Sequence, residues 1–160
     1  MTNLTNFDVF MGVGAIIQAY DTNIPMIIDG MDMPSLESST KWIKYSYLGN
    51  LPRASRVVQI NTRFPFELIC YSRSAFLKND GAETSFVDHI KMADEYSDLL
   101  NQKNFQIKNS CIRLEECRIS ILDLRSATFT AQSISTGTTP LLNCQAAVIL
   151  VDGRLITNKE

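Results

Sequence analysis

The stretch RFPFELICYSR (Arg63–Arg73) and the later stretch FVDHIKMADEYSDLL (Phe86–Leu100) decide the fold of this chain. In the first, apolar side chains fall on both alternating faces, a pattern typical of a strand that is covered on both sides. In the second, apolar residues including Ile90 and Ala93 recur three or four positions apart, which indicates an amphipathic helix with a buried apolar stripe. A long strand that passes through a polar gap into a helix predicts a compact domain containing both kinds of element.

The composition agrees with one globular domain spanning residues 1–160. The chain is 45% hydrophobic and 20% charged, and its net charge of −2 gives no electrostatic reason to bind DNA or RNA. No apolar run approaches the roughly 18–20 residues that cross a bilayer, so we expect no membrane contact. The opening residues Met1–Asn6 carry no basic side chain, so we expect no signal peptide.

The four cysteines lie in apolar, strand-like runs and lack the paired spacing of a zinc site. We expect reduced, mostly buried thiols in a cytosolic protein, with a disulfide as the minority alternative. They are Cys70, Cys111, Cys117 and Cys144.

The remaining pattern predicts one more helix and several strands. The helix spans Thr5–Tyr20, with Phe7 and Tyr20 among the residues on its apolar face and with Thr5 and Asp8 forming a capping box. The predicted strands, including the one within the opening stretch, are Met26–Ile28, Lys41–Leu48, Val57–Ile60, Phe64–Ser72, Ile112–Leu124, Ala127–Ala131 and Leu141–Val151.

Two of these strands contain or meet an irregularity. In Ile112–Leu124 the apolar phase switches at Glu115-Glu116, which requires a bulge or a break. After the last strand, Asp152-Gly153 indicates a tight turn from which Arg154–Ile156 returns as a short hairpin. The predicted fold is α+β, a mostly antiparallel mixed sheet of about five to six strands with two main helices packed on one face.

Catalytic chemistry finds little support in the residues. His89 is the only histidine, so any Ser-His-Asp or Cys-His arrangement would have to use it. On the predicted second helix it is expected to be a surface or boundary residue. Cys70 as a nucleophile would need His89 beside it and a lowered pKa, and its place in a buried strand argues against that.

A small metal-dependent nuclease is the alternative from a different functional class. Glu115, Glu116 and Asp123 lie on one predicted strand, and Glu116-Cys117-Arg118 faintly resembles the second element of such a carboxylate site. Charged residues at a strand irregularity more often form a solvated edge or a subunit contact. No glycine-rich phosphate loop occurs, so we expect no cofactor and no metal. A ligand-binding module with a pocket between helix and sheet is a further alternative, with no ligand indicated.

The element order and several local strings resemble the tail terminator proteins of long-tailed bacteriophages, the group that includes the lambda and T5 tail terminators. The resemblance covers most of the chain. It is carried by the helix Phe7–Tyr20, the extended segment Ile24-Pro25-Met26-Ile27-Ile28, the strand ending in Cys70-Tyr71-Ser72-Arg73, the helix Phe86–Leu100 and the strands Ile112–Leu124 and Leu142–Val151.

This resemblance implies a non-enzymatic structural protein of the virion. Members form hexameric rings that cap the tail tube and offer a surface for joining the head. The implied partners are further copies of the chain, the tail tube protein and a head completion or connector protein, with DNA only as passing cargo. The implied location is the tail end or neck of the virion after assembly in the host cytoplasm. Another head-tail joining or tail completion protein is the structural alternative.

Ring contacts use edges and mixed polar and apolar surfaces rather than a deep pocket. We therefore predict that the contacts fall in loops and at the strand irregularity, with arginine favoured because it is enriched at interfaces. The predicted contact residues are Arg53, Arg56, Glu115, Glu116, Ser135, Thr136 and Thr138.

Overall fold

The chain folds into two helices and a curled mixed sheet, an α+β architecture, as expected. The computed structural model describes residues 4–28, 31–32, 34, 36, 39–47, 63–73, 88–122, 128–129 and 142–158. Within this part the elements are α1 (Asn6–Tyr20), β1 (Met26–Ile28), β2 (Lys41–Tyr47), β3 (Arg63–Arg73), α3 (Asp88–Leu100), β4 (Asn104–Ile107), β5 (Ser110–Leu114), β6 (Arg118–Leu122), β7 (Thr128–Phe129) and β8 (Leu142–Asn158).

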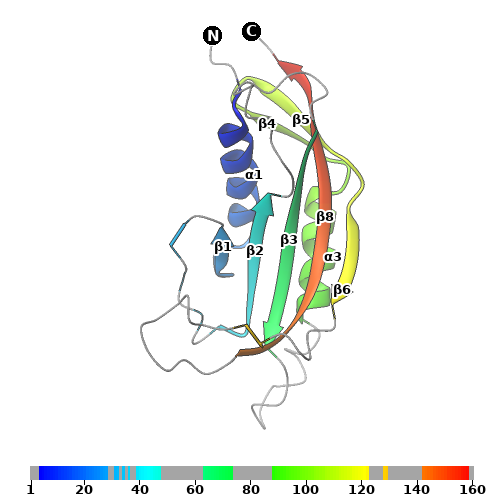
Figure 1. The fold of residues 1–160 in the computed structure, drawn as a ribbon. Coiled ribbons are helices and arrows are strands. Elements are labelled where there is room, and N and C mark those ends of the chain that lie inside the picture. Colours follow the sequence, from blue (N-terminus) through cyan, green and yellow to red (C-terminus); the bar gives the residue numbers. More distant parts are fainter. Residues whose placement is uncertain are drawn as a thin grey trace.

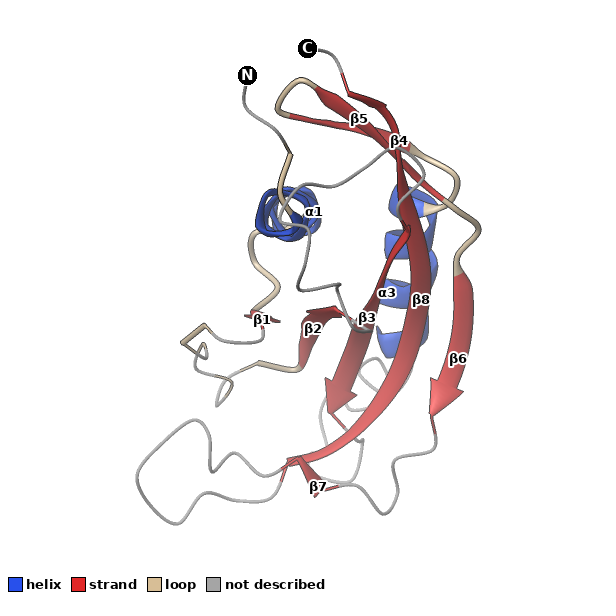
Figure 2. Cartoon of the chain, turned by 45° about the horizontal axis from the view of Figure 1, so that its top comes forward, coloured by secondary structure: helices blue, strands red, loops and turns tan. Residues whose placement is uncertain are grey.

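The eight strands of the described residues form one sheet in the order β1-β2-β3-β8-β5-β4, and β6 and β7 also pair with β8. Only β1 and β2 pair in parallel; the other pairings are antiparallel. There are more strands than the expected five to six because β5 and β6 are separate and the short β4 joins the edge. Figure 2 shows how the sheet curls, with β6 along one side.

The first helix begins as the sequence predicts. The backbone N–H of Asp8 donates to Thr5 Oγ1 over 3.2 Å, and the Asp8 carboxylate accepts from the Thr5 N–H over 2.9 Å, which completes the capping box. The expected apolar face is wrong at its ends, because Phe7 is 68% exposed and Tyr20 is 45% exposed. The buried stripe consists instead of Val9, Val13, Gly14 and Ile17.

Both helices cover the same face of the sheet, which we call the core face. In Figure 1, α3 lies behind β3 and β8. Phe66, Leu68 and Cys70 point from β3 into the core and are fully buried, together with Met92 and Tyr96 of α3. On the opposite, outer face of β3, Arg63 is exposed, Pro65, Glu67 and Ile69 are half-buried, and Tyr71 is buried. Burial on both faces, as predicted for this strand, is therefore complete on only one.

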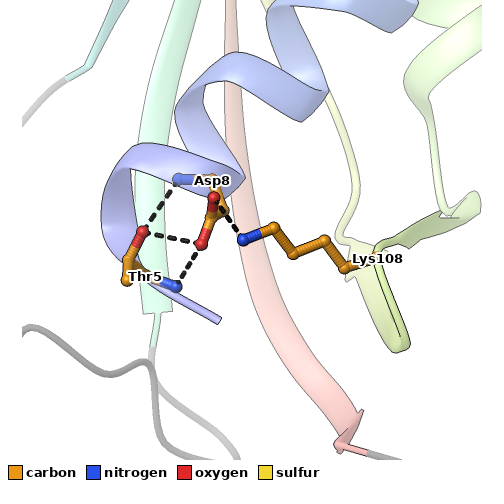
Figure 3. Close-up of polar contacts among 3 residues, drawn as sticks. All are labelled: Thr5, Asp8 and Lys108. Carbon is orange, nitrogen blue, oxygen red and sulfur yellow. Dashed lines mark hydrogen bonds and ion pairs between the residues drawn. The ribbon is translucent and has the colours of Figure 1, made fainter. Parts of the chain in front are cut away.

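The hairpin formed by β4 and β5 closes over the start of α1 (Figure 3). A Cβ atom on Gly12 would meet Ile107 at 2.6 Å, so the glycine allows β4 to approach the helix. In the hairpin turn, Lys108 Nζ lies 2.8 Å from Asp8 Oδ1. The hydrogen bond from Lys108, followed by that from Thr5, lowers the pKa of Asp8 to about 2.

The last strand contradicts the predicted turn at Asp152-Gly153. β8 continues through both residues to Asn158, and no return hairpin forms over Arg154–Ile156. The glycine is required by packing instead, since a Cβ atom on it would lie 2.2 Å from Cε2 of Phe64. A glycine inside a strand often marks such a close approach.

The predicted break near Glu115-Glu116 is confirmed. Leu114 pairs with Gly153, and Arg118 pairs with Leu150. Three residues (115–117) therefore separate the ends of β5 and β6, whereas two (151–152) separate their partners on β8. One extra residue reverses the alternation of side chains, which accounts for the switch in apolar phase. Of the described helices, neither is long and apolar enough to cross a bilayer.

Candidate interaction surface

Three arginines line up across the outer face of the sheet. Arg63 on β3 pairs directly with Arg154 on β8, which pairs directly with Arg113 on β5. Directly opposite residues in antiparallel strands point to the same face. Adjacent strands lie roughly 4.8 Å apart, so the backbone positions span about 10 Å. We call Arg63, Arg154 and Arg113 the arginine row.

The arginine row is only partly neutralised. Arg154 Nε lies 3.0 Å from Glu115 Oε1, and both side chains remain more than a third exposed. Arg63 and Arg113 have no ion pair within the described residues. Like charges directly opposite one another destabilise a sheet. The row therefore carries a positive charge that an acidic partner would stabilise.

A small hollow lies beside the arginine row, where the extra residue separates β5 from β6. Its volume is about 160 Å³, well below the roughly 300–1,000 Å³ of typical small-molecule pockets. We call it the bulge hollow. It is lined by Pro65, Phe66, Glu116, Arg118, Leu150, Val151 and Asp152.

An apolar edge lies on the other side of the sheet. Ile119 and Ile121 of β6 pair with the buried Ile149 and Ala147, so they point to the core face, yet they are 41% and 62% exposed. Ile90 on α3 is also exposed, at 36%, although it was expected in the buried stripe of that helix. Among the described strands β6 pairs only with β8, so its other edge is open. We call Ile90, Ile119 and Ile121 the isoleucine edge.

The solvent side of α3 is acidic. Asp94, Glu95 and Asp98 are all exposed and lie within one helical turn of one another, with the exposed Lys91 one turn earlier. None of the three carboxylates forms an ion pair with another described residue. We call Asp94, Glu95 and Asp98 the acidic helix face.

Of the predicted contact residues, the structure describes two. Glu115 is half-buried and paired with Arg154, and Glu116 is exposed at the bulge hollow. Asp123, the third carboxylate of the nuclease alternative, lies outside the described part of the chain. Within that part, no group of three or more His, Cys, Asp or Glu residues is placed to hold a metal ion. The other predicted contacts also lie outside it: Arg53, Arg56, Ser135, Thr136 and Thr138.

The expectation of a surface or boundary histidine is wrong. His89 is 2% exposed, and its Nδ1 lies 2.8 Å from Oγ of the fully buried Ser72. The first turn of α3 packs against the end of β3, which brings the two polar side chains together inside the protein. Burial raises the pKa of the nearby strand residue Cys70 to about 12, so its thiol is protonated at neutral pH and is a poor nucleophile.

The described cysteines are free thiols, but the expectation that they are mostly buried is wrong, because only the first of the three is buried and the other two are half-buried. They are Cys70, Cys111 and Cys117. Burial also raises the pKa of Cys117, to about 11. The fourth cysteine lies on β8, and its side chain is outside the described part.

Sequence reasoning missed the arginine row for a specific reason. The predicted turn at Asp152-Gly153 removed Arg154 from the main strand, so its alignment with Arg63 and Arg113 was hidden. An uninterrupted β8, together with its register, would have revealed the row. Register between strands distant in sequence is not encoded in any local string.

No family model matches this chain, and no curated protein matches it in sequence. One solved structure is similar over 96% of this chain and 93% of its own, with a TM-score of 0.50 and 10% sequence identity. Its name states no activity or partner. At that identity the likeness shows a shared fold alone.

Proposed function

We propose that this protein is a phage tail terminator, a non-enzymatic subunit that forms a ring on the last layer of the tail tube and provides a surface for the head connector. Its partners are other copies of the chain, the tail tube protein and a head completion protein. It acts in the neck of the virion, after assembly in the host cytoplasm. We propose this family because the order of helices and strands along the whole chain resembles that of tail terminators.

The isoleucine edge is the observation that carries this proposal. Apolar side chains on an open strand edge form a natural site of association with another protein chain. Ile121 is the most exposed of the three, and it lies on a strand whose outer edge has no partner among the described strands. A subunit that completes itself in an assembly accounts for this exposure.

The absence of an activated nucleophile among the best enzymatic candidates also favours a structural role. The thiol of Cys70 is buried with a raised pKa, and Glu115 of the nuclease alternative is engaged by Arg154. These groups face different sides of the sheet and do not converge on one cleft.

The test is binding to tail tubes assembled from the tube protein of the same genome. Co-sedimentation with the tubes and negative-stain imaging should show the chain at the tube end as a ring. Failure to associate with tubes at micromolar concentration would contradict the proposal. A monomer in the absence of tubes would not, since the tube end can act as the template.

The matched variants replace exposed apolar residues by aspartate. Ile119→Asp with Ile121→Asp should abolish ring formation while circular dichroism remains unchanged. Phe7→Asp is the control, because Phe7, at 68%, is more exposed than either isoleucine but lies on α1. Assembly unaffected by the isoleucine changes would remove the supporting observation. Labelled imaging of particles separates a terminator from another head-tail joining protein, because only the terminator lies directly on the last tube ring.

A further inference from the structure

We propose that, in the ring, the acidic helix face and isoleucine edge of one copy dock onto the arginine row and bulge hollow of the next copy. This inference rests on the proposed function and identifies which two surfaces of the subunit meet. The occupant of the arginine row is therefore a second copy of this chain.

The two surfaces carry opposite charges. The arginine row offers Arg63 and Arg113 without ion pairs in the described part, and the acidic helix face offers three carboxylates in the same condition. Both sets of charges are also compact, each extending over about 10 Å or less. The row spans about 10 Å across three strands, and the four-residue step from Asp94 to Asp98 spans about 6 Å along the helix.

The two surfaces lie on opposite sides of the subunit. α3 packs on the core face of the sheet, whereas the arginine row lies on the outer face. The two surfaces therefore cannot neutralise each other within one subunit. Contacts between different patches on opposite sides of a subunit are heterologous, and such contacts close into rings when the rotation between copies allows it. The placement suits a ring and not a two-fold dimer.

Apolar groups accompany the charges on both surfaces. Ile90 lies one turn before Asp94 on α3, next to the acidic helix face. The bulge hollow lies beside the arginine row, and its lining includes Pro65 and the exposed Leu150. A contact with an apolar centre and a charged rim is the usual anatomy of a protein–protein interface.

Nucleic acid is the rival partner for the arginine row, and the surroundings disfavour it. Glu115 is bound to Arg154, and Asp152 lies two positions before Arg154 on β8, on the same face. A DNA backbone laid across the sheet would meet these carboxylates as well as the arginines. In the proposed contact the carboxylates of the helix pair with the row, and the apolar isoleucine edge, which carries no phosphate charge, lies over the hollow that Asp152 lines.

Charge exchange tests the contact directly. The row variant is Arg63→Glu with Arg113→Glu, and the helix variant is Asp94→Lys with Asp98→Lys. Each alone should lose self-association by at least tenfold, measured by native mass spectrometry and sedimentation with tail tubes at low salt. An equimolar mixture should recover assembly as alternating rings, because each reversed surface then meets an opposite charge.

A chain carrying all four changes is the matched control. It keeps the wild-type net charge of −2 and should assemble alone, which excludes misfolding as the cause of the earlier losses. Assembly that is unaffected by either variant, or that no mixture restores, would overturn the inference while wild-type rings on tubes would still support the proposed function. Wild-type chain that neither forms rings nor binds tubes would overturn both. Loss of DNA retention in a gel, with assembly intact, would identify the row as a nucleic-acid site and would also overturn the inference.

Discussion

β5 and β6 lie end to end along the same edge of β8, yet their surroundings differ. Ile112 and Leu114 of β5 are fully buried, whereas Ile119 and Ile121 of β6 point to the same core face and are largely exposed. β5 is paired on both sides, by β4 and β8, and belongs to the hairpin that closes over α1. β6 is paired on one side only among the described strands.

The comparison teaches that one apolar pattern serves two purposes. On β5 it stabilises the subunit, and on β6 it is available to a neighbour. Substitutions on β5 should therefore change the free energy of unfolding, while substitutions on β6 should change assembly.

Truncation on the two strands should have unequal effects on stability. Leu114→Ala should lower the free energy of unfolding by about 2–5 kcal/mol, because the residue is fully buried and its loss leaves a cavity. Ile121→Ala should change it by less than about 0.5 kcal/mol, since that side chain is 62% exposed. Urea unfolding of both variants measures the difference. Equal losses would show that β6 is part of the core and would break the comparison.

β5 and β6 both pair with β8. The packing of β8 can be tested at Gly153, which pairs with the last residue of β5. Gly153→Ala should destabilise the protein by about 1–3 kcal/mol, because the new methyl group would overlap the ring of Phe64. Adding Phe64→Leu should recover part of that loss by making room. The comparison of the two variants in thermal unfolding separates packing from backbone effects. A neutral Gly153→Ala would mean that Phe64 can move aside.

β5 is covered because the β4–β5 hairpin closes over α1, where Lys108 of the hairpin pairs with Asp8 of the helix. Asp8→Asn should cost about 1 kcal/mol or less at neutral pH, because it removes the charge that pairs with the exposed Lys108. Urea unfolding against the wild type measures the loss. Lys108→Ala should reproduce most of it, and the double variant should add little more.

The same pair gives a defined pH dependence. The folded-state pKa of Asp8 is about 2, below its ordinary value of about 3.9. The contribution of the ionised Asp8 carboxylate to the free energy of unfolding is therefore fully present above pH 4 and disappears as the pH falls through about 2. The difference in stability between wild type and Asp8→Asn should shrink over that interval. A difference that stays constant from pH 6 to pH 2 would show that the carboxylate is not held by Lys108.

The smallest effect is expected in the segment that separates the two strands. Glu115→Gln should lower stability by about 0.5 kcal/mol or less, since both side chains of its ion pair with Arg154 are more than a third exposed and the pair is screened by salt. Urea unfolding at low and high ionic strength measures it. A loss above about 2 kcal/mol would indicate that this pair, and not the backbone bulge, holds β5 and β6 in register.

Local strings predicted the local structure well. The capping box at Thr5 and Asp8, the strand predicted at Phe64–Ser72 and the phase switch at Glu115-Glu116 each depend on residues within a few positions of one another. Where distant packing decides, local rules were insufficient. The Asp-Gly pair at 152–153 has the composition of a turn, but the ring of Phe64 requires the glycine there.

The candidate site was less predictable than the fold. The arginine row exists only because three strands far apart in sequence share one register, and the buried Ser72–His89 contact exists only because α3 docks on β3. Neither leaves a signal in a single sequence. Phe7 and Ile90 show the related error, since helical periodicity identifies a stripe but not how far the sheet extends beneath it.

Hydrogen–deuterium exchange followed before and after assembly on tail tubes tests most directly whether β6 is the surface that meets a neighbour. The account predicts that the amides of β5 are protected throughout, while those of β6 exchange faster in the isolated chain and become protected in the assembly. Protection on β6 that is already complete in the isolated chain, or that does not change when the chain binds tubes, would contradict it.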